Sequence, residues 1–192
     1  MTKILLLVLS YGIGSISGSF LLGRWVLGVD VRHAGSGNAG TTNAMRVLGR
    51  KLGALTFLID WLKGILAMLL VHWIAPEFSV PCALFCVLGH DFPFYMRWKG
   101  GKGVATTFGC FLIINPFAAL IAGFFWLVSM LVSRYVSLGS LVLFTVLAFV
   151  YRGPYMPLVW AIALLGYFQH RSNILRLLKG TERRIGKKEV ES

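Results

Sequence analysis

The sequence predicts an all-α integral membrane protein with about seven transmembrane helices, its N-terminus outside and its C-terminus in the cytoplasm. Of the 192 residues, 57% are hydrophobic and 14% are charged, and the mean hydropathy is +0.75. Soluble domains are roughly half apolar and about a quarter charged. The charge is also one-sided, since 19 Lys and Arg against 7 Asp and Glu leave a net charge of +12. This balance excludes a water-soluble globule, and it favours a lipid surface over nucleic acid as the partner of the positive charge.

Seven apolar segments are candidates to cross a bilayer, whose hydrocarbon core of roughly 30 Å requires about 20 helical residues. They cover residues 4–23, 53–74, 78–96, 104–114, 117–133, 136–151 and 155–170. The first has no clear small-residue cleavage site, so we expect a retained span and not a signal peptide. The fourth and fifth could form one long helix, but Asn115 and Pro116 interrupt them. Proline breaks or kinks a helix interior, so we predict a turn there.

The positions of the cations orient the chain. Sixteen of the 19 Lys and Arg residues lie in residues 24–52, in residues 97–103, at Arg134 or in the tail 171–192. The positive-inside rule places these segments in the cytoplasm. Because residues 97–103 and the tail are then on the same side of the membrane, an even number of crossings separates them, which the predicted turn supplies. We find no linker or low-complexity tract, and therefore expect residues 1–192 to form a single polytopic domain.

The first cytoplasmic loop contains the glycine-rich stretch RHAGSGNAGTTNAMRVLGRKLG, residues 32–53. Backbone N–H groups of successive glycines can converge on an anion, and a helix N-terminus that follows adds favourable partial charge. Arg46 could supply a permanently charged fork to phosphate oxygens. The candidate phosphate-site residues in this loop are Gly35, Ser36, Gly37, Asn38, Thr41 and Arg46.

Two other interpretations of this loop compete. GSGNAG matches G-x-G-x-x-G, and Asp60 follows 20 residues after Gly40. The preceding GVDVRHA, with its charged residues, is not a buried parallel strand, so we reject a dinucleotide-binding fold. The loop could also be a flexible juxtamembrane segment whose arginines contact lipid headgroups.

A second glycine cluster surrounds Lys102 in GHDFPFYMRWKGGKGVATT, residues 89–107. Gly100, Gly101 and Gly103 would form a backbone nest with an ammonium group inside it, which suits phosphate. The spacing is not that of a Walker A loop, and a turn with an interfacial lysine is the alternative. His90 and Asp91 precede this cluster, but sequence neighbours point apart on a helix, so we expect a structural, interfacial His90.

The C-terminal stretch QHRSNILRLLKGTERR, residues 169–184, offers a third set of candidates. If it is helical, His170 and Asn173 share a face and present a hydrogen-bonding ring and an amide beside several cations. Glu182, among those cations, is expected to pair with them. The alternative is a basic amphipathic helix on the membrane surface.

Inside the second span, Asp60 and Lys63 are three residues apart. Each would cost roughly 2.5–3.5 kcal/mol near a bilayer centre, so we expect them to pair inward and give structural support by tying helices together. They could instead line the polar floor of a site. The four histidines form no metal-ligand cluster with carboxylates at helical spacing, so we expect no metal and no cofactor.

The ordered motifs SGSFLLGR, RHAGSGNAGTTNAMRVLGRKLG, GHDFPFYMRWKGGKGVATT, SLGS and HRSNILRLLKGTE span nearly the whole chain. Together they resemble the PlsY family of bacterial acyl-phosphate:glycerol-3-phosphate acyltransferases. The resemblance implies a seven-span enzyme of the bacterial plasma (inner) membrane whose active site faces the cytoplasm. Its reaction would transfer a fatty acyl group from acyl phosphate to the 1-hydroxyl of glycerol 3-phosphate, giving lysophosphatidic acid and inorganic phosphate in phospholipid biosynthesis.

The resemblance also implies roles for individual residues. Ser36 and Arg46 belong to the first functional motif, the glycines around Lys102 to the glycerol-phosphate loop, and His170 and Asn173 to the third motif, which Glu182 supports. Transient contact with the enzyme that makes acyl phosphate is a further expectation. Two mechanisms stay open, direct attack by the glycerol hydroxyl and an acyl-enzyme on Ser36. A transporter or exchanger of organic phosphates is the competing function.

Overall fold

The computed structural model describes residues 1–186, which are helices joined by turns and loops, so Lys187 and Lys188 of the predicted basic tail lie outside the described residues. The α-helices are α1 (Thr2–Ser15), α2 (Gly18–Leu27), α3 (Thr41–Val47), α4 (Arg50–Ile74), α5 (Ser79–Asp91), α6 (Val104–Ile114), α7 (Pro116–Ser133), α8 (Val136–Val150), α9 (Met156–Gln169) and α10 (Arg171–Leu178). Three short 3-10 turns join them, η1 (Val31–His33), η2 (Pro76–Phe78) and η3 (Phe94–Met96).

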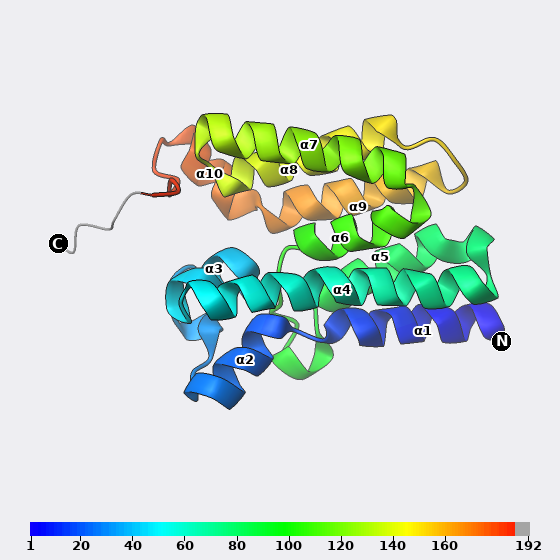
Figure 1. The fold of residues 1–192 in the computed structure, drawn as a ribbon, viewed down its shortest axis with the longest axis horizontal. Helices are drawn as coiled ribbons and strands as arrows, with labels where there is room; N and C mark the ends of the chain where they lie inside the picture. The colour runs from blue at the N-terminus through cyan, green and yellow to red at the C-terminus, as the bar shows by residue number, and fades with distance from the viewer. Residues whose placement is uncertain (187–192) are drawn as a thin grey trace.

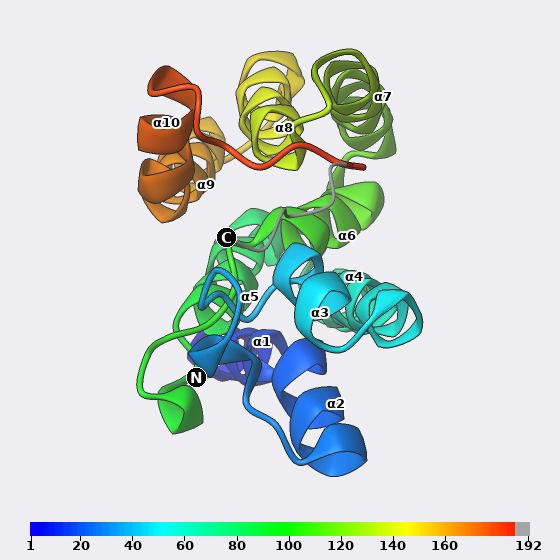
Figure 2. The same cartoon turned by 90° about the vertical axis from the view of Figure 1, so that its left-hand side faces the viewer.

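The helices form two groups with a pair of helices between them (Figure 1). One group contains α1 to α4, the other contains α7 to α10, and α5 and α6 lie in the middle, as the end-on view also shows (Figure 2). Helix α5 packs against α1 and α9, and α6 packs against α4 and α7. The glycine-rich segment around α3 and the helix α10 therefore face each other at the same end of the molecule.

Every predicted apolar segment is helical, but the helices differ in length. Helix α4, the stretch Pro76–Met96 and α7 are each long and apolar enough to cross a membrane, and α1 with α2 qualifies as one bent span. The other three, α6, α8 and α9, are shorter apolar helices. Residues 1–186 are therefore helical with three or four clear candidate spans, and the count of seven crossings stays a prediction.

The predicted turn between the fourth and fifth segments is confirmed. Helix α6 ends at Ile114, and α7 begins at Pro116, where a missing N–H costs no hydrogen bond. The side chain of Asn115 accepts a hydrogen bond from the backbone N–H of Ala118 at 3.0 Å and so caps α7.

The first predicted span, residues 4–23, is not one straight helix. It breaks after Ser15, and α2 continues at an angle of 42° to α1. Ile16 and Ser17 adopt extended backbone, and the Ser17 hydroxyl accepts from the N–H of Phe20 at 3.4 Å to begin α2. An apolar run reveals only that a segment prefers lipid, whereas a serine that caps a new helix decides where it bends.

Glycines allow two pairs of helices to pack closely. A Cβ atom would overlap the facing helix at four glycines where α1 meets α5 and α4 meets α6: Gly14, Gly89, Gly64 and Gly109. Small residues of this kind let membrane helices approach closely. The three cysteines are buried as well, Cys82 and Cys86 on α5 and Cys110 on α6.

A small second core anchors the first glycine loop. Its buried members come from η1, from the loop, from the region of α3 and from η3: Val31, Ala39, Ala44, Leu48 and Met96. This cluster fixes the first loop to the segment that leads into the second glycine cluster, because Met96 precedes that cluster by only a few residues.

Candidate functional site

The first glycine loop is organised by a buried asparagine. The side-chain oxygen of Asn43 accepts the N–H of Ser36 at 2.8 Å, and its amide nitrogen donates to the carbonyl groups of Val31 at 2.8 Å and Ala34 at 3.1 Å. Gly35 has a φ of 62°, and a Cβ there would overlap the Asn43 side chain. The sequence analysis did not select Asn43, because one amide among many polar loop residues carries no signal of burial.

The two glycine loops are in direct contact. The N–H of Ala39 and the side-chain amide of Asn38 both donate to the carbonyl of Gly100, each at 3.2 Å. On the other side, the Ser19 hydroxyl on α2 donates to the carbonyl of Ala39 at 2.7 Å. Two segments that are about 60 residues apart in sequence therefore meet through backbone carbonyl groups.

A charged pair reinforces this contact. The guanidinium of Arg32 donates to the carboxylate of Asp30 at 2.9 and 2.6 Å, and to the carbonyl of Met96 at 2.6 Å. The side-chain hydrogen bond from Arg32 lowers the pKa of Asp30 to about 2. Bidentate pairing fixes the guanidinium plane, so Arg32 holds the first loop against η3.

The second glycine cluster is held by the end of α5. The N–H of Gly100 donates to the carbonyl of Asp91 and the N–H of Gly101 to the carbonyl of His90, each at 3.0 Å. Gly103 has a φ of 73° and precedes the first residue of α6. Lys102 is thus placed at a helix N-terminus, where negative charge is favoured.

Lys102 connects this cluster to the third predicted motif. Its ammonium donates to the side-chain oxygen of Asn173, whose amide nitrogen donates to Glu182 at 2.6 Å. Glu182 also accepts from the Ser137 hydroxyl at 2.7 Å and from the Nε of Arg176 at 2.6 Å. Because Glu182 takes the amide nitrogen, the oxygen of Asn173 faces Lys102.

The carboxylate of Glu182 is ionised by these partners. Burial raises its pKa, but the hydrogen bonds from Asn173, Ser137 and Arg176 together lower it by more than burial raises it. The net result is a pKa below the ordinary value. The predicted pairing of Glu182 with a cation is present in the structure. Ser137, which belongs to the SLGS motif, is a partner that the sequence analysis did not assign.

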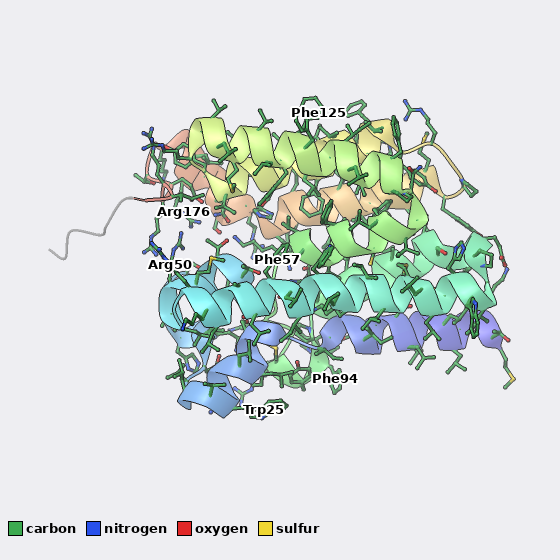
Figure 3. All side chains as sticks on the ribbon, in the orientation of Figure 1. Trp25, Arg50, Phe57, Phe94, Phe125 and Arg176 are labelled. Atoms are coloured by element: carbon green, nitrogen blue, oxygen red, sulfur yellow. The ribbon has the colours of Figure 1, made fainter. Side chains whose placement is uncertain are left out.

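Positive charge gathers around Lys102. Burial first, and then the charges of Arg176, Arg46 and Arg171, lower its pKa from 10.5 to about 8 against the opposing effect of Glu182. These arginines come from α3 and α10, and Figure 3 shows Arg176 and Arg50 at the same end of the molecule, on the two facing groups of helices. Cations that lower the pKa of a lysine create a positive electrostatic potential, and such a potential attracts anions.

His170 lies between α9 and α10 and is buried. Its Nδ1 is 2.8 Å from the carbonyl of Gly166, so Nδ1 donates and Nε2 is left as an acceptor. In its neutral form the ring offers a hydrogen-bond acceptor beside the cations.

The structure does not bring every predicted residue into direct contact. Ser36 is exposed in the loop and Arg46 is exposed on α3, whose first residue is Thr41. Within residues 1–186, no hydrogen bond joins the Ser36 hydroxyl to His33 or to His170. Arg46 acts on Lys102 through its charge.

Asp60 and Lys63 pair inside the bundle, with Nζ 2.9 Å from the carboxylate. His90, which we expected at the interface, is instead buried beside them, with its Nδ1 2.8 Å from Nζ of Lys63. The local sequence could not show this, because α5 brings His90 next to α4 only in the folded bundle. Among residues 1–186, no three His, Cys, Asp or Glu side chains form a group that could hold a metal ion.

Comparison with known proteins gives consistent results. A family model described as glycerol-3-phosphate acyltransferase matches residues 4–180. A protein named glycerol-3-phosphate acyltransferase from Halalkalibacterium halodurans is 40% identical over 197 residues, which cover 96% of each chain. The protein of the same name from Finegoldia magna is 42% identical over 192 residues, again 96% of each chain.

Two solved structures are similar in fold. The crystal structure of PlsY, an integral membrane glycerol 3-phosphate acyltransferase, in its glycerol 3-phosphate form has a TM-score of 0.90 and 36% identity. Its lysophosphatidic acid form has a TM-score of 0.87 and 34% identity. Each comparison covers 97% of this chain and 96% of the other.

Proposed function

The chain belongs to the glycerol-3-phosphate acyltransferase family, and from this premise we propose that it transfers a fatty acyl group from acyl phosphate to the 1-hydroxyl of glycerol 3-phosphate. The products are lysophosphatidic acid and inorganic phosphate, at an early step of membrane phospholipid synthesis. One observation carries the proposal: partly buried Lys102 lies among three arginines and two glycine loops at one end of an apolar helix bundle. Such a site suits two phosphorylated substrates, one of which carries a lipid chain.

Charge is the first requirement of this reaction, because both substrates bear phosphate groups that repel each other. We infer that Lys102, Arg46 and the N–H groups of Gly35 and Gly103 hold these phosphates, because the N–H groups of Gly37, Gly100 and Gly101 already donate to backbone carbonyl groups. Asn38 and Gly100 keep the two loops together through their shared hydrogen bond. The solved PlsY structures in glycerol 3-phosphate and lysophosphatidic acid forms support this choice of substrate and product.

The chemical step is a direct acyl transfer. The oxygen of the 1-hydroxyl attacks the acyl carbonyl carbon and forms the ester C–O bond, while the C–O bond to the phosphoryl group breaks. The phosphate leaves with that electron pair, and it accepts the proton of the hydroxyl group. Because acyl phosphate is a mixed anhydride with a good leaving group, the enzyme supplies position and charge stabilisation more than a strong base.

His170 and Asn173 orient the acceptor in this scheme. Neutral His170 has a free lone pair on Nε2 that can accept a hydrogen bond from the glycerol hydroxyl. Asn173 is fixed by Glu182 and sets the direction of the Lys102 ammonium. Both therefore act through hydrogen bonds to substrate or to Lys102.

The acyl-enzyme alternative requires a base next to Ser36. Direct transfer is favoured, since within residues 1–186 neither His33 nor His170 is hydrogen-bonded to that hydroxyl. Rapid quench of the enzyme with labelled acyl phosphate separates the two mechanisms. Direct transfer gives no labelled protein before glycerol 3-phosphate is added, whereas a trapped acyl-enzyme that forms and decays at the turnover rate would contradict it.

We further infer that residues 1–192 form one domain with seven crossings in the bacterial plasma (inner) membrane, the N-terminus outside and the C-terminus inside. The gathering of cations at the end that contains α3 and α10 supports a site that faces the cytoplasm. Glycerol 3-phosphate then reaches the site from water and the acyl chain from the bilayer. Transient contact with the enzyme that makes acyl phosphate would deliver the insoluble donor.

Purified protein in detergent tests the function. Acyl phosphate and glycerol 3-phosphate should together give lysophosphatidic acid, measured by mass spectrometry, and phosphate in equal amount. Absence of product in this assay would contradict the proposal, and equal turnover with acyl-CoA would overturn the choice of donor. The transporter alternative is not supported, because the matched relatives and structures are acyltransferases.

A further inference from the structure

A buried polar cluster lies under the two glycine loops. Lys63 and Asp60 of α4 and His90 of α5 are each at most 5% exposed. The ammonium of Lys63 is 2.9 Å from Asp60, 2.8 Å from Nδ1 of His90 and 2.6 Å from the carbonyl of Ile16. An ammonium has three donors, and here three acceptors surround it, so Nδ1 of His90 accepts and the ring proton is on Nε2.

The cluster extends to the bend between α1 and α2. Ile16 gives its carbonyl to Lys63, and the N–H of Gly18 donates to Asp60 at 3.4 Å. One residue later, Ser19 binds the carbonyl of Ala39 in the first glycine loop. The charges therefore fix the start of α2 and, through it, the position of that loop.

The cluster also touches the second loop. The His90 carbonyl accepts from Gly101, and a Cβ on Gly101 would overlap the imidazole at Nε2. The Nε2 edge of the imidazole is therefore packed against the backbone of Gly101, the residue that immediately precedes Lys102. A group whose only task was to tie α4 to α5 would not have to contact this loop.

We propose that Asp60, Lys63 and His90 form a positioning cluster that holds both glycine loops in register, so that Lys102 meets the phosphate of glycerol 3-phosphate in the correct place. The inference rests on the proposed function and adds His90 to the residues that shape the site. The cluster does not contact substrate. It acts through Gly101 on one side and through Ser19 and Ala39 on the other.

Two variants separate positioning from simple stability. The double variant Asp60→Asn with Lys63→Met removes both charges together, which leaves no buried ion without a partner. His90→Asn keeps a side-chain acceptor for Lys63 in place of Nδ1 but removes the ring edge at Gly101. We expect both variants to stay folded, with KM for glycerol 3-phosphate raised on the order of tenfold. The KM for acyl phosphate should change less.

A matched control comes from the same helix. Met68 on α4 is fully buried in the apolar core, so Met68→Ala should lower the unfolding temperature and leave KM unchanged. A second readout needs no turnover, because the rise in unfolding temperature on adding glycerol 3-phosphate alone should shrink in both positioning variants and persist in Met68→Ala.

The outcomes distinguish the two proposals. Wild-type protein that does not produce lysophosphatidic acid would overturn the proposed function. Active wild-type protein, together with folded variants that keep the wild-type KM and the wild-type response to glycerol 3-phosphate, would overturn the positioning role.

Discussion

Two polar clusters of this molecule differ in how their charge is balanced. In the buried cluster, Asp60 neutralises Lys63, and His90 accepts the remaining hydrogen bond. In the outer cluster, Lys102 has a neutral partner in Asn173, while Glu182 is occupied by Arg176. The first cluster is complete without a ligand, and the second has positive charge left over.

The difference indicates which lysine is structural, and it supports our proposal that the other one, Lys102, meets the substrate. A buried charge whose partners are all in place fixes the geometry of the groups around it. Unbalanced positive charge at a partly open end of the molecule instead attracts anions. The pKa of Lys102 expresses the surplus, since burial and three arginines lower it to about 8. Both lysines lie in the same bundle, but only Lys63 is paired directly with a carboxylate, whereas the ammonium of Lys102 contacts the neutral side chain of Asn173.

The largest effect on stability should come from removing one partner of the ion pair between Asp60 and Lys63. Lys63→Met leaves Asp60 buried without its partner, so the free energy of unfolding should fall by about 3–5 kcal/mol. Thermal unfolding in detergent measures the loss. Lys3→Met removes an exposed lysine and should leave the unfolding temperature nearly unchanged. Equal unfolding temperatures for both variants would show that the buried pair is not required.

Removal of Lys102 should affect activity without affecting stability. Lys102→Met eliminates the charge that we propose meets the substrate phosphate, so kcat/KM for glycerol 3-phosphate should fall by about a hundredfold. The unfolding temperature should not fall, because the buried charge disappears with the side chain. Lys99→Met is the matched control, an exposed lysine of the same loop. Similar kinetics in both variants would remove Lys102 from the site.

The contact between the two clusters can be strained directly. Gly101→Ala places a methyl group against the His90 ring, so the free energy of unfolding should drop by about 1–3 kcal/mol. KM for glycerol 3-phosphate should rise at the same time. Gly12→Ala on α1, where nothing lies within 4 Å of the added Cβ, should change neither quantity. An unchanged KM in Gly101→Ala would show that the contact between His90 and Gly101 does not influence the binding of glycerol 3-phosphate.

The smallest effect should be the pH dependence of substrate binding. Because burial, more than any other cause, lowers the pKa of Lys102 from 10.5 to about 8, the folded protein loses this proton at a lower pH than the unfolded chain does. KM for glycerol 3-phosphate should therefore rise by up to about tenfold per pH unit above that pKa. Lys102→Arg stays charged and should flatten the profile. Superimposable profiles would contradict the assignment.

The same pKa has a consequence for stability with the opposite direction. Between about pH 8 and 10.5 the unfolded chain still holds the proton that the folded protein has released, so this group makes folding more favourable as the pH rises through that window. The contribution is absent in Lys102→Met. Comparison of the two unfolding curves over this range isolates it.

Much of the helical layout could be predicted from apolar runs and breaks. The segment ends at Asn115 and Pro116 follow from local chemistry, and the structure has them where expected. The bend after Ser15 was not predicted, because Ile16 and Ser17 continue an apolar run without a proline. The Ile16 carbonyl, which the break in the helix leaves without a helical partner, accepts a hydrogen bond from Lys63, a residue 47 positions away.

Some features of the candidate site could also be predicted from the sequence, and others could not. Glycines around a lysine indicate an anion site from sequence alone, and so do the cations of the tail. The roles of Asn43 and His90 could not be predicted, since each depends on burial by a distant element. The side on which Asn173 presents its oxygen depends on Glu182, nine residues further along the chain.

By itself, the sequence determined that this is an apolar helical protein with its positive charge at one end and three motifs suited to phosphate. These properties depend on composition and short-range order, which every conformation of the chain shares. Only the tertiary structure decided which lysine is neutralised and which has surplus charge, because this depends on the distances between Lys63 and Asp60 and between Lys102 and its neighbouring arginines. Electrostatic energies vary with distance and burial, and both are set when the helices pack.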